Sequence, residues 1–407
     1  GARAPMQRFV ERFAKYYTPL VFLAAILATV IPPVFMGVAW TTSVYTGLVL
    51  LVVGCPCALV ISTPVAIVSG MTAAARHGIL VKGGIFLEEG RRLDCLAIDK
   101  TGTLTRGKPS LTDFVGANDA DSARAFAIAS SLAARSDHPV SRAIAENAAA
   151  RGIALLDVDA FTAIPGQGVS GLIEGHKWRL GNLRMLEESK MRDSGERDET
   201  ERIKESILRL EAQGKTVVAL IGDAVRGIFA VADTLKDSSV EAVRELKMLG
   251  VKTVMLTGDN AHTAEVVAKR AGVDDFRASL LPEDKLRIVE ELSREGYVGM
   301  AGDGINDAPA LAGAHIGFAM AGAGTDTAVE TADVALMDDD LGKIPRFIRL
   351  SRATHAILIQ NLVFALGVKA AFFTLTFTGY ATMWMAVFAD VGTSLLVVAN
   401  GLSTLRK

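Results

Sequence analysis

Cysteine is scarce in this sequence: its 407 residues include three, at positions 55, 57 and 95. Three thiols, two of them one residue apart, do not make the disulfide framework of a small secreted domain. They indicate a reduced compartment or a metal site. The N-terminus also lacks the apolar run of a signal peptide, because charged residues lie where that run would be: Arg3, Arg8, Glu11, Arg12 and Lys15.

The sequence has no marked excess of either charge, since 43 basic and 45 acidic residues give a net charge of -2. This balance offers no argument for a nucleic-acid partner, and we expect none. Hydrophobic residues are abundant instead, at 50% of the chain, and the mean hydropathy is +0.33. The length predicts two or three domains, and the hydropathy predicts that apolar residues are concentrated in some of them.

Four apolar stretches are long enough to cross a bilayer, which takes about 20 residues. Their outer flanks are basic, whereas the turns that join them in pairs contain no Lys or Arg. The positive-inside rule therefore predicts two membrane hairpins, with both termini and residues 72–352 in the cytoplasm. Buried core helices are the alternative, but all four would have to mimic span length and charge asymmetry together. The stretches are Thr18–Met36, Val44–Gly70, Ala356–Thr378 and Met383–Gly401.

Three short apolar runs in the cytosolic segment are each followed by an acidic residue. Amphipathic helical patterns lie between these runs, which predicts a parallel, doubly wound α/β sheet. Ligands of such sheets bind at the carboxyl ends of the strands. Acidic residues there favour Mg²⁺ and phosphate, because hard cations prefer oxygen ligands. The runs are Leu93–Ile98 before Asp99, Val251–Leu256 before Asp259, and Tyr297–Ala301 before Asp303.

The strongest motif is the string from Asp99 to Thr105, Asp-Lys-Thr-Gly-Thr-Leu-Thr. A carboxylate at a strand end can attack a phosphoryl group as a nucleophile. Such a transfer depends on positioning and on neutralising charge, so a lysine, a hydroxyl and a cation are needed. Lys285 can offset the phosphate charge, Thr257 can hydrogen-bond a phosphate oxygen, and Asp259 lies beside it. Asp303 and Asp307 can hold Mg²⁺.

Two further strings follow the Asp99 motif, Thr257-Gly258-Asp259 and Gly302-Asp303-Gly304-Ile305-Asn306-Asp307. The three strings, in this order, resemble the cytosolic signatures of P-type ATPases. The resemblance implies a haloacid-dehalogenase-like phosphorylation domain of α/β class, an inserted α+β nucleotide-binding domain and a helical transmembrane bundle. It implies that Asp99 accepts the phosphate of ATP, with Mg²⁺ held by Asp99, Thr101 and Asp303. The expected domains are 1–71 with the first membrane hairpin, 72–109 with 225–352 for phosphorylation, 110–224 for nucleotide binding, and 353–407 with the second hairpin.

Within the inserted region, Ser136-Asp137-His138-Pro139 resembles the His-Pro motif of heavy-metal P-type ATPases, whose histidine orients adenine. Taken alone, His138 would more readily be a helix-capping surface histidine. Gly166-Gln167-Gly168 would let backbone approach a nucleotide, and Gly181-Asn182 matches a further nucleotide-site pair. Residues 166–171 also fit a dinucleotide fingerprint, but a lone match is weak evidence. Copper-pump relatives carry glutamate where this sequence has Ala133, so some adenine contact must differ or come from elsewhere.

Cys55-Pro56-Cys57 lies inside the second apolar stretch. Proline breaks a helix, and a broken helix inside a membrane can line a cavity where freed carbonyls and side chains hold ions. Two thiolates favour soft or borderline metals. Two intramembrane charges, Lys369 and Asp390, are costly and so indicate function; a structural salt bridge between them is the compatible alternative.

The Cys-Pro-Cys motif, Lys369 and Asp390 together resemble the zinc/cadmium/lead subgroup of these pumps. The resemblance implies Cys55, Cys57 and Asp390 as ligands of the transported Zn²⁺, Cd²⁺ or Pb²⁺, and Lys369 as a built-in counter-ion for Asp390. The expected protein is a monomer in a bacterial inner membrane with its catalytic domains in the cytoplasm. A Cu⁺ exporter, a membrane-anchored phosphatase and a nucleotide-binding regulatory module are the competing interpretations.

Pumps of this subgroup also have four earlier spans, an N-terminal metal-binding region and an actuator domain with a Thr-Gly-Glu string. That string is absent here. We therefore expect the sequence to be a fragment that accepts phosphate, dephosphorylates slowly and does not transport by itself.

Overall fold

The computed structural model describes residues 4–117, 121–188, 197–303, 307–321 and 330–406. Two compact units emerge from the contacts within the chain. The first comprises Gly1–Leu96, Glu245–Val251 and Leu286–Lys407, and the second comprises Ala97–Arg244 and Lys252–Lys285. Each unit is described by itself.

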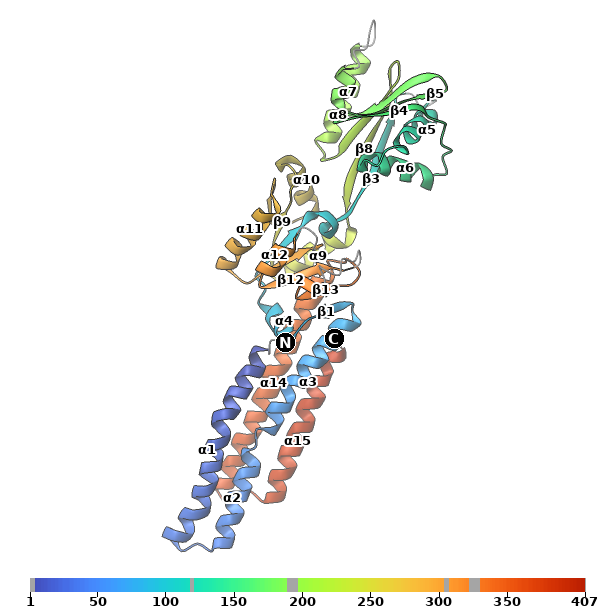
Figure 1. Cartoon of the computed structure of the whole chain (residues 1–407). Coiled ribbons are helices and arrows are strands. Elements are labelled where there is room, and N and C mark those ends of the chain that lie inside the picture. Colours follow the sequence, from blue (N-terminus) through green and yellow to red (C-terminus); the bar gives the residue numbers. More distant parts are fainter. Residues whose placement is uncertain (1–3, 118–120, 189–196, 304–306, 322–329, 407) are drawn as a thin grey trace. The chain divides into compact units, whose positions relative to one another are not determined.

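Long apolar helices dominate the first unit, where they form one bundle (Figure 1). In the described residues, four helical segments are long and apolar enough to span a membrane, which agrees with the four predicted stretches. The bundle helices are α1 (Pro5–Met36), α2 (Trp40–Gly54), α3 (Cys57–Arg76), α14 (Lys343–Phe377) and α15 (Met383–Leu402). Some of these helices extend beyond the predicted apolar stretches. Helices α1 and α14 begin before them and α3 ends after one, so the basic flanking residues lie in helical turns.

The helix of the second predicted span is broken near Pro56, as we predicted from that proline. Helix α2 ends at Gly54 and α3 begins at Cys57, with Pro56 as the residue before its first turn. Proline has no N–H to donate, and its ring excludes the preceding helical turn. The carbonyls of the last turn of α2 are consequently released from helical hydrogen bonds and become available to other groups.

A seven-stranded sheet has the order β1-β13-β12-β11-β2-β9-β10. The pairs β11–β12, β12–β13 and β9–β10 are parallel, as predicted, but the edge strand β1 runs antiparallel to β13. Strand β2 is buried throughout, which fits its continuous apolar run and a parallel sheet covered on both faces. The strands are β1 (Ile79–Val81), β2 (Cys95–Asp99), β9 (Lys252–Leu256), β10 (Asp275–Arg277), β11 (Val298–Gly302), β12 (Ile316–Met320) and β13 (Val334–Leu336).

A second, six-stranded sheet lies within the second unit, in the order β3-β8-β7-β6-β5-β4. All of its strand pairs are antiparallel. Its strands are β3 (Thr105–Gly116), β4 (Asp159–Ile164), β5 (Gly168–Ile173), β6 (His176–Gly181), β7 (Thr216–Ile221) and β8 (Val225–Leu235). This antiparallel arrangement contrasts with the mostly parallel pairing of the seven-stranded sheet.

The helices outside the bundle lie between the strands in sequence. One core of the six-stranded sheet packs Phe126, Leu132 and Ile144 from its helices against Phe229. The remaining helices are α4 (Gly84–Glu89), α5 (Ser122–Ala133), α6 (Pro139–Ala150), α7 (Leu183–Glu188), α8 (Arg197–Glu211), α9 (Asp237–Met248), α10 (Ala261–Ala271), α11 (Pro282–Glu295) and α12 (Ala308–Gly313).

Candidate functional site

Asp99 is the last residue of β2, and it is 5% exposed. The Lys285 ammonium donates to its Oδ1 at 2.6 Å, and Lys285 is itself 8% exposed. Removing either partner would leave the other as an uncompensated buried charge. Lys285 lies in the first turn of α11, 186 residues away in sequence. The structure thus unites the predicted nucleophile and its predicted lysine.

The loop after β9 lies beside the same strand end. The Lys100 ammonium donates to Asp259 at 2.8 Å, which joins the residue after Asp99 to the Thr-Gly-Asp string. Thr257 is 2% exposed, and its hydroxyl oxygen accepts from the Asp259 N–H at 3.1 Å. Thr101 is exposed in the turn that follows Asp99. The second unit therefore contains Asp99, Lys285, Thr257 and Asp259 as one group.

The remaining acidic string belongs to the first unit. Asp303 directly follows β11, and Asp307, which is 1% exposed, precedes α12. Gly302 is required there because a Cβ at this position would lie 2.8 Å from the Asp307 carboxylate. Residues 304–306 lie outside the described residues. The Mg²⁺ ligand set of Asp99, Thr101 and Asp303 remains a prediction.

A cavity of about 450 Å³ in the second unit contains most of the predicted nucleotide-binding residues. His138 lines it and also caps α6, because its Nδ1 accepts the Val140 N–H at 3.3 Å. The capping and binding interpretations of this histidine are therefore compatible. The other predicted residues in the lining are Gly166, Gly168 and Asn182.

The glycines of this cavity allow two backbone segments to meet. Asn182 donates from its amide to the Gly166 carbonyl at 2.9 Å. A Cβ on Gly168 would overlap the carbonyl of Leu180, and one on Gly181 would overlap the carbonyl of Gln167. Gly168 opens β5 at the end of a β4–β5 hairpin rather than a turn into a helix, so residues 166–171 are not a dinucleotide fingerprint. Ala133 is fully buried in a hydrophobic core, away from the cavity lining.

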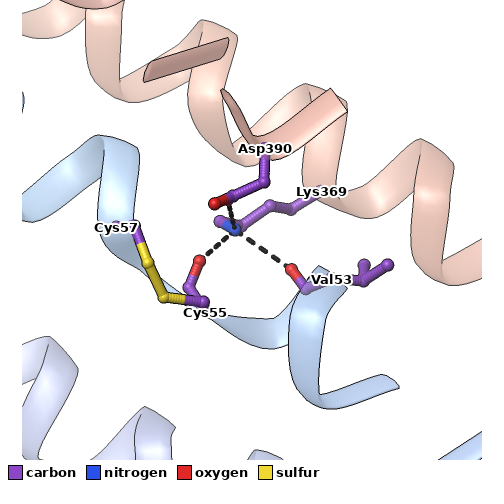
Figure 2. The surroundings of a disulfide bond; sticks show 5 residues. All are labelled: Val53, Cys55, Cys57, Lys369 and Asp390. Atoms are coloured by element: carbon purple, nitrogen blue, oxygen red, sulfur yellow. Dashed lines mark hydrogen bonds and ion pairs between the residues drawn. A yellow bond between two sulfur atoms is a disulfide. The ribbon is translucent and has the colours of Figure 1, made fainter. Parts of the chain in front are cut away.

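Lys369 of α14 reaches the broken segment between α2 and α3 (Figure 2). Its ammonium donates to the Val53 carbonyl at 3.0 Å, to the Cys55 carbonyl and to Asp390 of α15, with 3.4 Å to Oδ1. Lys369 is 9% exposed. Beside it, a cavity of about 10 Å³ lined by Asp390 and Thr393 has room for about one water. The ammonium therefore sits among the oxygen atoms freed by the helix break.

The two cysteines differ from the sequence-based expectation. We expected a reduced compartment or a metal site from these cysteines, whereas the structure joins Cys55 and Cys57 in a disulfide (Figure 2). The turn at Pro56 brings their Cα atoms to 5.4 Å, within the range that a disulfide spans. Within the described residues, no three His, Cys, Asp or Glu side chains gather closely enough to hold a metal ion. Of the predicted ligands, Asp390 and the backbone of Cys55 contact Lys369, and the assignment of Cys55, Cys57 and Asp390 to the transported ion remains a prediction.

Sequence reasoning missed a polar network in the same bundle. The Asn361 amide donates to the Ser62 hydroxyl at 2.7 Å and to the Val397 carbonyl at 2.9 Å. Asn400 donates to the Asn361 amide oxygen at 2.8 Å. The signal was two asparagines inside predicted spans, where polar side chains need partners. This network connects α3, α14 and α15.

The chain is similar to a known protein family and to characterised membrane ATPases. Residues 93–315 match the haloacid dehalogenase-like hydrolase family. The whole chain is 46% identical to a probable cadmium-transporting ATPase of Staphylococcus aureus (strain MRSA252), of which it covers 56%. It is 42% identical to the zinc/cadmium/lead-transporting P-type ATPase of Escherichia coli (strain K12), of which it covers 54%. The chain therefore spans about half the length of these curated relatives.

A solved structure matches as well. The crystal structure of a zinc-transporting PIB-type ATPase in the E2.Pi state has a TM-score of 0.86 and 42% sequence identity, and the match covers 99% of this chain and 65% of that one. The match includes both the membrane helices and the two sheets. The predicted fold class is confirmed.

Proposed function

The chain belongs to the haloacid dehalogenase-like hydrolases and, within them, to the P-type ATPases, and we propose that it serves ATP-driven export of a divalent heavy-metal cation. The observation that carries this proposal is the environment of Lys369. An ammonium surrounded by two backbone carbonyls and the Asp390 carboxylate has the kind of ligands that a metal cation would have. The relatives named above are cadmium and zinc transporters, which supports the same class of ion.

Phosphoryl transfer to Asp99 is the proposed chemical step. A carboxylate oxygen of Asp99 attacks the γ-phosphorus of ATP, the bond to the bridging oxygen breaks, and ADP leaves. The Lys285 ammonium, 2.6 Å from Oδ1, offsets negative charge as the phosphoryl group approaches. Thr257 is positioned by its contact with Asp259 to hydrogen-bond a phosphoryl oxygen. These residues act by position and charge, which is what such transfers require.

Carboxylate and carbonyl oxygens near Asp99 suit Mg²⁺. We propose that Asp99, Thr101 and Asp303 would hold it, as the resemblance to P-type ATPases implies. When bound, Mg²⁺ would neutralise charge on the phosphate oxygens.

ATP binding is assigned to the cavity that His138 lines. Its volume of about 450 Å³ is in the range of small-molecule sites. We propose that His138 orients the adenine and that the Gly166–Gly168 turn, packed against Gly181, allows the nucleotide to approach the backbone. Asn182 holds this turn in place through the Gly166 carbonyl.

At the ion site, the proposed ligands of the transported cation are Cys55, Cys57 and Asp390. Thiolates are the nucleophilic, metal-binding form of cysteine, so this ligation requires the Cys55–Cys57 pair to be reduced. We propose that Lys369 retreats from Asp390 when the cation binds and returns as its counter-ion after release. The bilayer of a bacterial inner membrane, with the sheets on its cytoplasmic side, is the proposed location, and the protein is proposed to act as a monomer.

Metal-stimulated phosphorylation tests this function. Membranes containing the protein would be incubated with γ-³²P-labelled ATP and a reductant in the presence of Zn²⁺, Cd²⁺, Pb²⁺ or Cu⁺, and acid-stable label would be counted. We expect label with the divalent ions and none in the Asp99→Asn variant. Label with Cu⁺ alone would replace this ion class by the copper class, and label that ignores all metals would refute coupling to an ion.

A further inference from the structure

A second polar cavity lies in the first unit, apart from the residues assigned above. It has a volume of about 490 Å³ and is lined by the end of α3, by β1 and by the first turns of α14. Four charged or titratable side chains line it: His77, Glu245, Arg346 and Arg349. None of them has a role in the proposed phosphorylation, nucleotide or ion chemistry.

The two arginines of this cavity have different partners. Arg349 donates to the Glu245 carboxylate at 2.7 Å, so that pair is neutral as a whole. The Arg346 guanidinium instead lies 3.1 Å from Nε2 of His77. Arginine has only donors, so Nε2 of His77 must be the acceptor and the imidazole must be neutral, with its proton on Nδ1. Within the part of the chain that the structure describes, His77 is the hydrogen-bond partner recorded for Arg346.

A further cation lies close to the imidazole. Lys343 is paired with Asp338 at 2.6 Å, and its ammonium also donates to the Gly78 carbonyl at 3.4 Å. Burial first, and then the charges of Arg346 and Lys343, lower the pKa of His77. The positive charge of Arg346 therefore acts on the His77 imidazole. The carboxylate in the lining, Glu245, is already paired with Arg349.

We propose that this cavity binds an anion carrying a phosphate group, held by Arg346 and His77. The planar guanidinium presents two parallel donors that match phosphate oxygens. An anion between the two side chains would replace the Arg346–His77 hydrogen bond, and His77, once protonated, would add a third donor. The volume lies in the range of small-molecule sites, so a phosphate ester fits as well as inorganic phosphate.

The position along α14 favours a soluble anion over a lipid headgroup. Arg346 precedes Ala356, where the predicted apolar span begins, by ten residues, or about 15 Å of helix. The headgroup layer adds only about 5–8 Å beyond the hydrocarbon. Arg352 is nearer to the membrane, but it is not in the cavity lining and donates to the Leu249 carbonyl.

The titration of His77 tests the proposal locally. Phosphate bound at the phosphorylation site would not change this signal. The detergent-purified chain, labelled at histidine Cε1 with ¹³C, would be followed by NMR without Mg²⁺, in phosphate and in chloride of equal ionic strength. Comparison with His77→Gln identifies the signal among the six histidines. We expect phosphate to raise the pKa of His77, because a bound anion favours the imidazolium. Arg346→Gln should weaken phosphate binding about tenfold or more, since a charge-assisted hydrogen bond is lost.

Arg352→Gln is the matched control, because it removes an arginine from the same helix outside the cavity and should leave phosphate binding unchanged. A second arm adds phosphatidylglycerol or phosphatidylcholine vesicles in place of phosphate. A shift of the His77 pKa with phosphatidylglycerol, lost in Arg346→Gln, supports the site with a lipid as the source. A His77 titration that neither phosphate nor phosphatidylglycerol changes overturns the proposal, as does a phosphate effect that survives in Arg346→Gln.

Discussion

Each unit of the molecule contains a buried lysine paired with an aspartate, but the two pairs are built differently. In the second unit, Lys285 donates directly to Asp99 at 2.6 Å. In the first unit, Lys369 is 3.4 Å from Asp390 and also donates to the carbonyls of Val53 and Cys55. The first pair resembles a fixed charge compensation, whereas the second places an ammonium among several oxygen atoms.

This difference follows from what surrounds each aspartate. Asp99 is at the end of a regular buried strand, where the neighbouring backbone groups are already paired within the sheet. Asp390 faces a broken helix whose carbonyls have lost their helical donors. A lysine with three donors can serve all of these oxygens at once, and a metal cation could replace it. We therefore predict that Lys285 stays paired with the nucleophile Asp99, whereas a metal cation can take the place of Lys369 beside Asp390.

Asp99→Asn should have the largest effect, because it removes the nucleophile itself. We expect acid-stable labelling from γ-³²P-ATP to fall to background, while ATP still binds in the cavity lined by His138. Labelling and the binding of a fluorescent ATP analogue are measured on the same preparation. Label that persists in this variant would mean that another residue is the nucleophile, and the comparison of the two pairs would fail.

Lys285→Met should slow labelling by about a hundredfold or more, since a preorganised charge at the transferring group is lost. Breaking a buried pair also costs about 3–5 kcal/mol of stability, so thermal unfolding is recorded in parallel. Lys247→Met is the control, because Lys247 is an exposed lysine at the end of α9. Equal labelling rates in Lys285→Met and the wild type would show that this lysine has only a structural role.

Lys369→Met should have a smaller and different effect, with labelling retained and metal release slowed about tenfold or more by the loss of a charged donor. The protein is reduced, loaded with Zn²⁺ and passed over a chelating column. The measurement is the amount of Zn²⁺ that remains bound per protein chain. Thr374→Val serves as control, because the Thr374 hydroxyl donates to the Ala370 carbonyl of its own helix. Unchanged release in Lys369→Met would make the Lys369–Asp390 pair a structural salt bridge.

His138→Asn and His138→Ala together sharpen the account of the nucleotide cavity with the smallest expected changes. Both should weaken ATP binding several-fold, because both remove the imidazole. Only alanine should also destabilise α6, by about 1 kcal/mol, since asparagine can still cap the helix. Isothermal titration with ATP and thermal unfolding separate the two contributions. Wild-type affinity in both variants would restrict His138 to its capping role.

The sequence predicted much of this molecule. The spans, the helix break at Pro56, the strand before Asp99 and most amphipathic helices follow from local patterns of apolar residues and proline. The grouping of Asp99 with Thr257 and Asp259 followed from the rule that parallel strands end at one edge of a sheet. Each of these features depends on a few consecutive residues or on the general geometry of parallel sheets.

Other features could not be predicted because they depend on which atoms meet after folding. No local pattern shows that the Asn361 amide would connect Ser62 and Val397, which are far from it in sequence. The disulfide drawn between Cys55 and Cys57 depends on the turn that Pro56 adopts. The reversed direction of β1 depends on how the chain leaves α3.

By itself, the sequence determined that Asp99 follows a buried strand and that two cysteines and a proline interrupt a membrane span, because these are properties of neighbouring residues. Only the tertiary structure decided that Lys285 contacts Asp99, while Lys369 shares its donors among Asp390 and two backbone carbonyls. The physical reason is that the residue type alone fixes the charge of a side chain. Its partners depend on how helices and strands pack, and the residues that meet here are 21 to 316 positions apart.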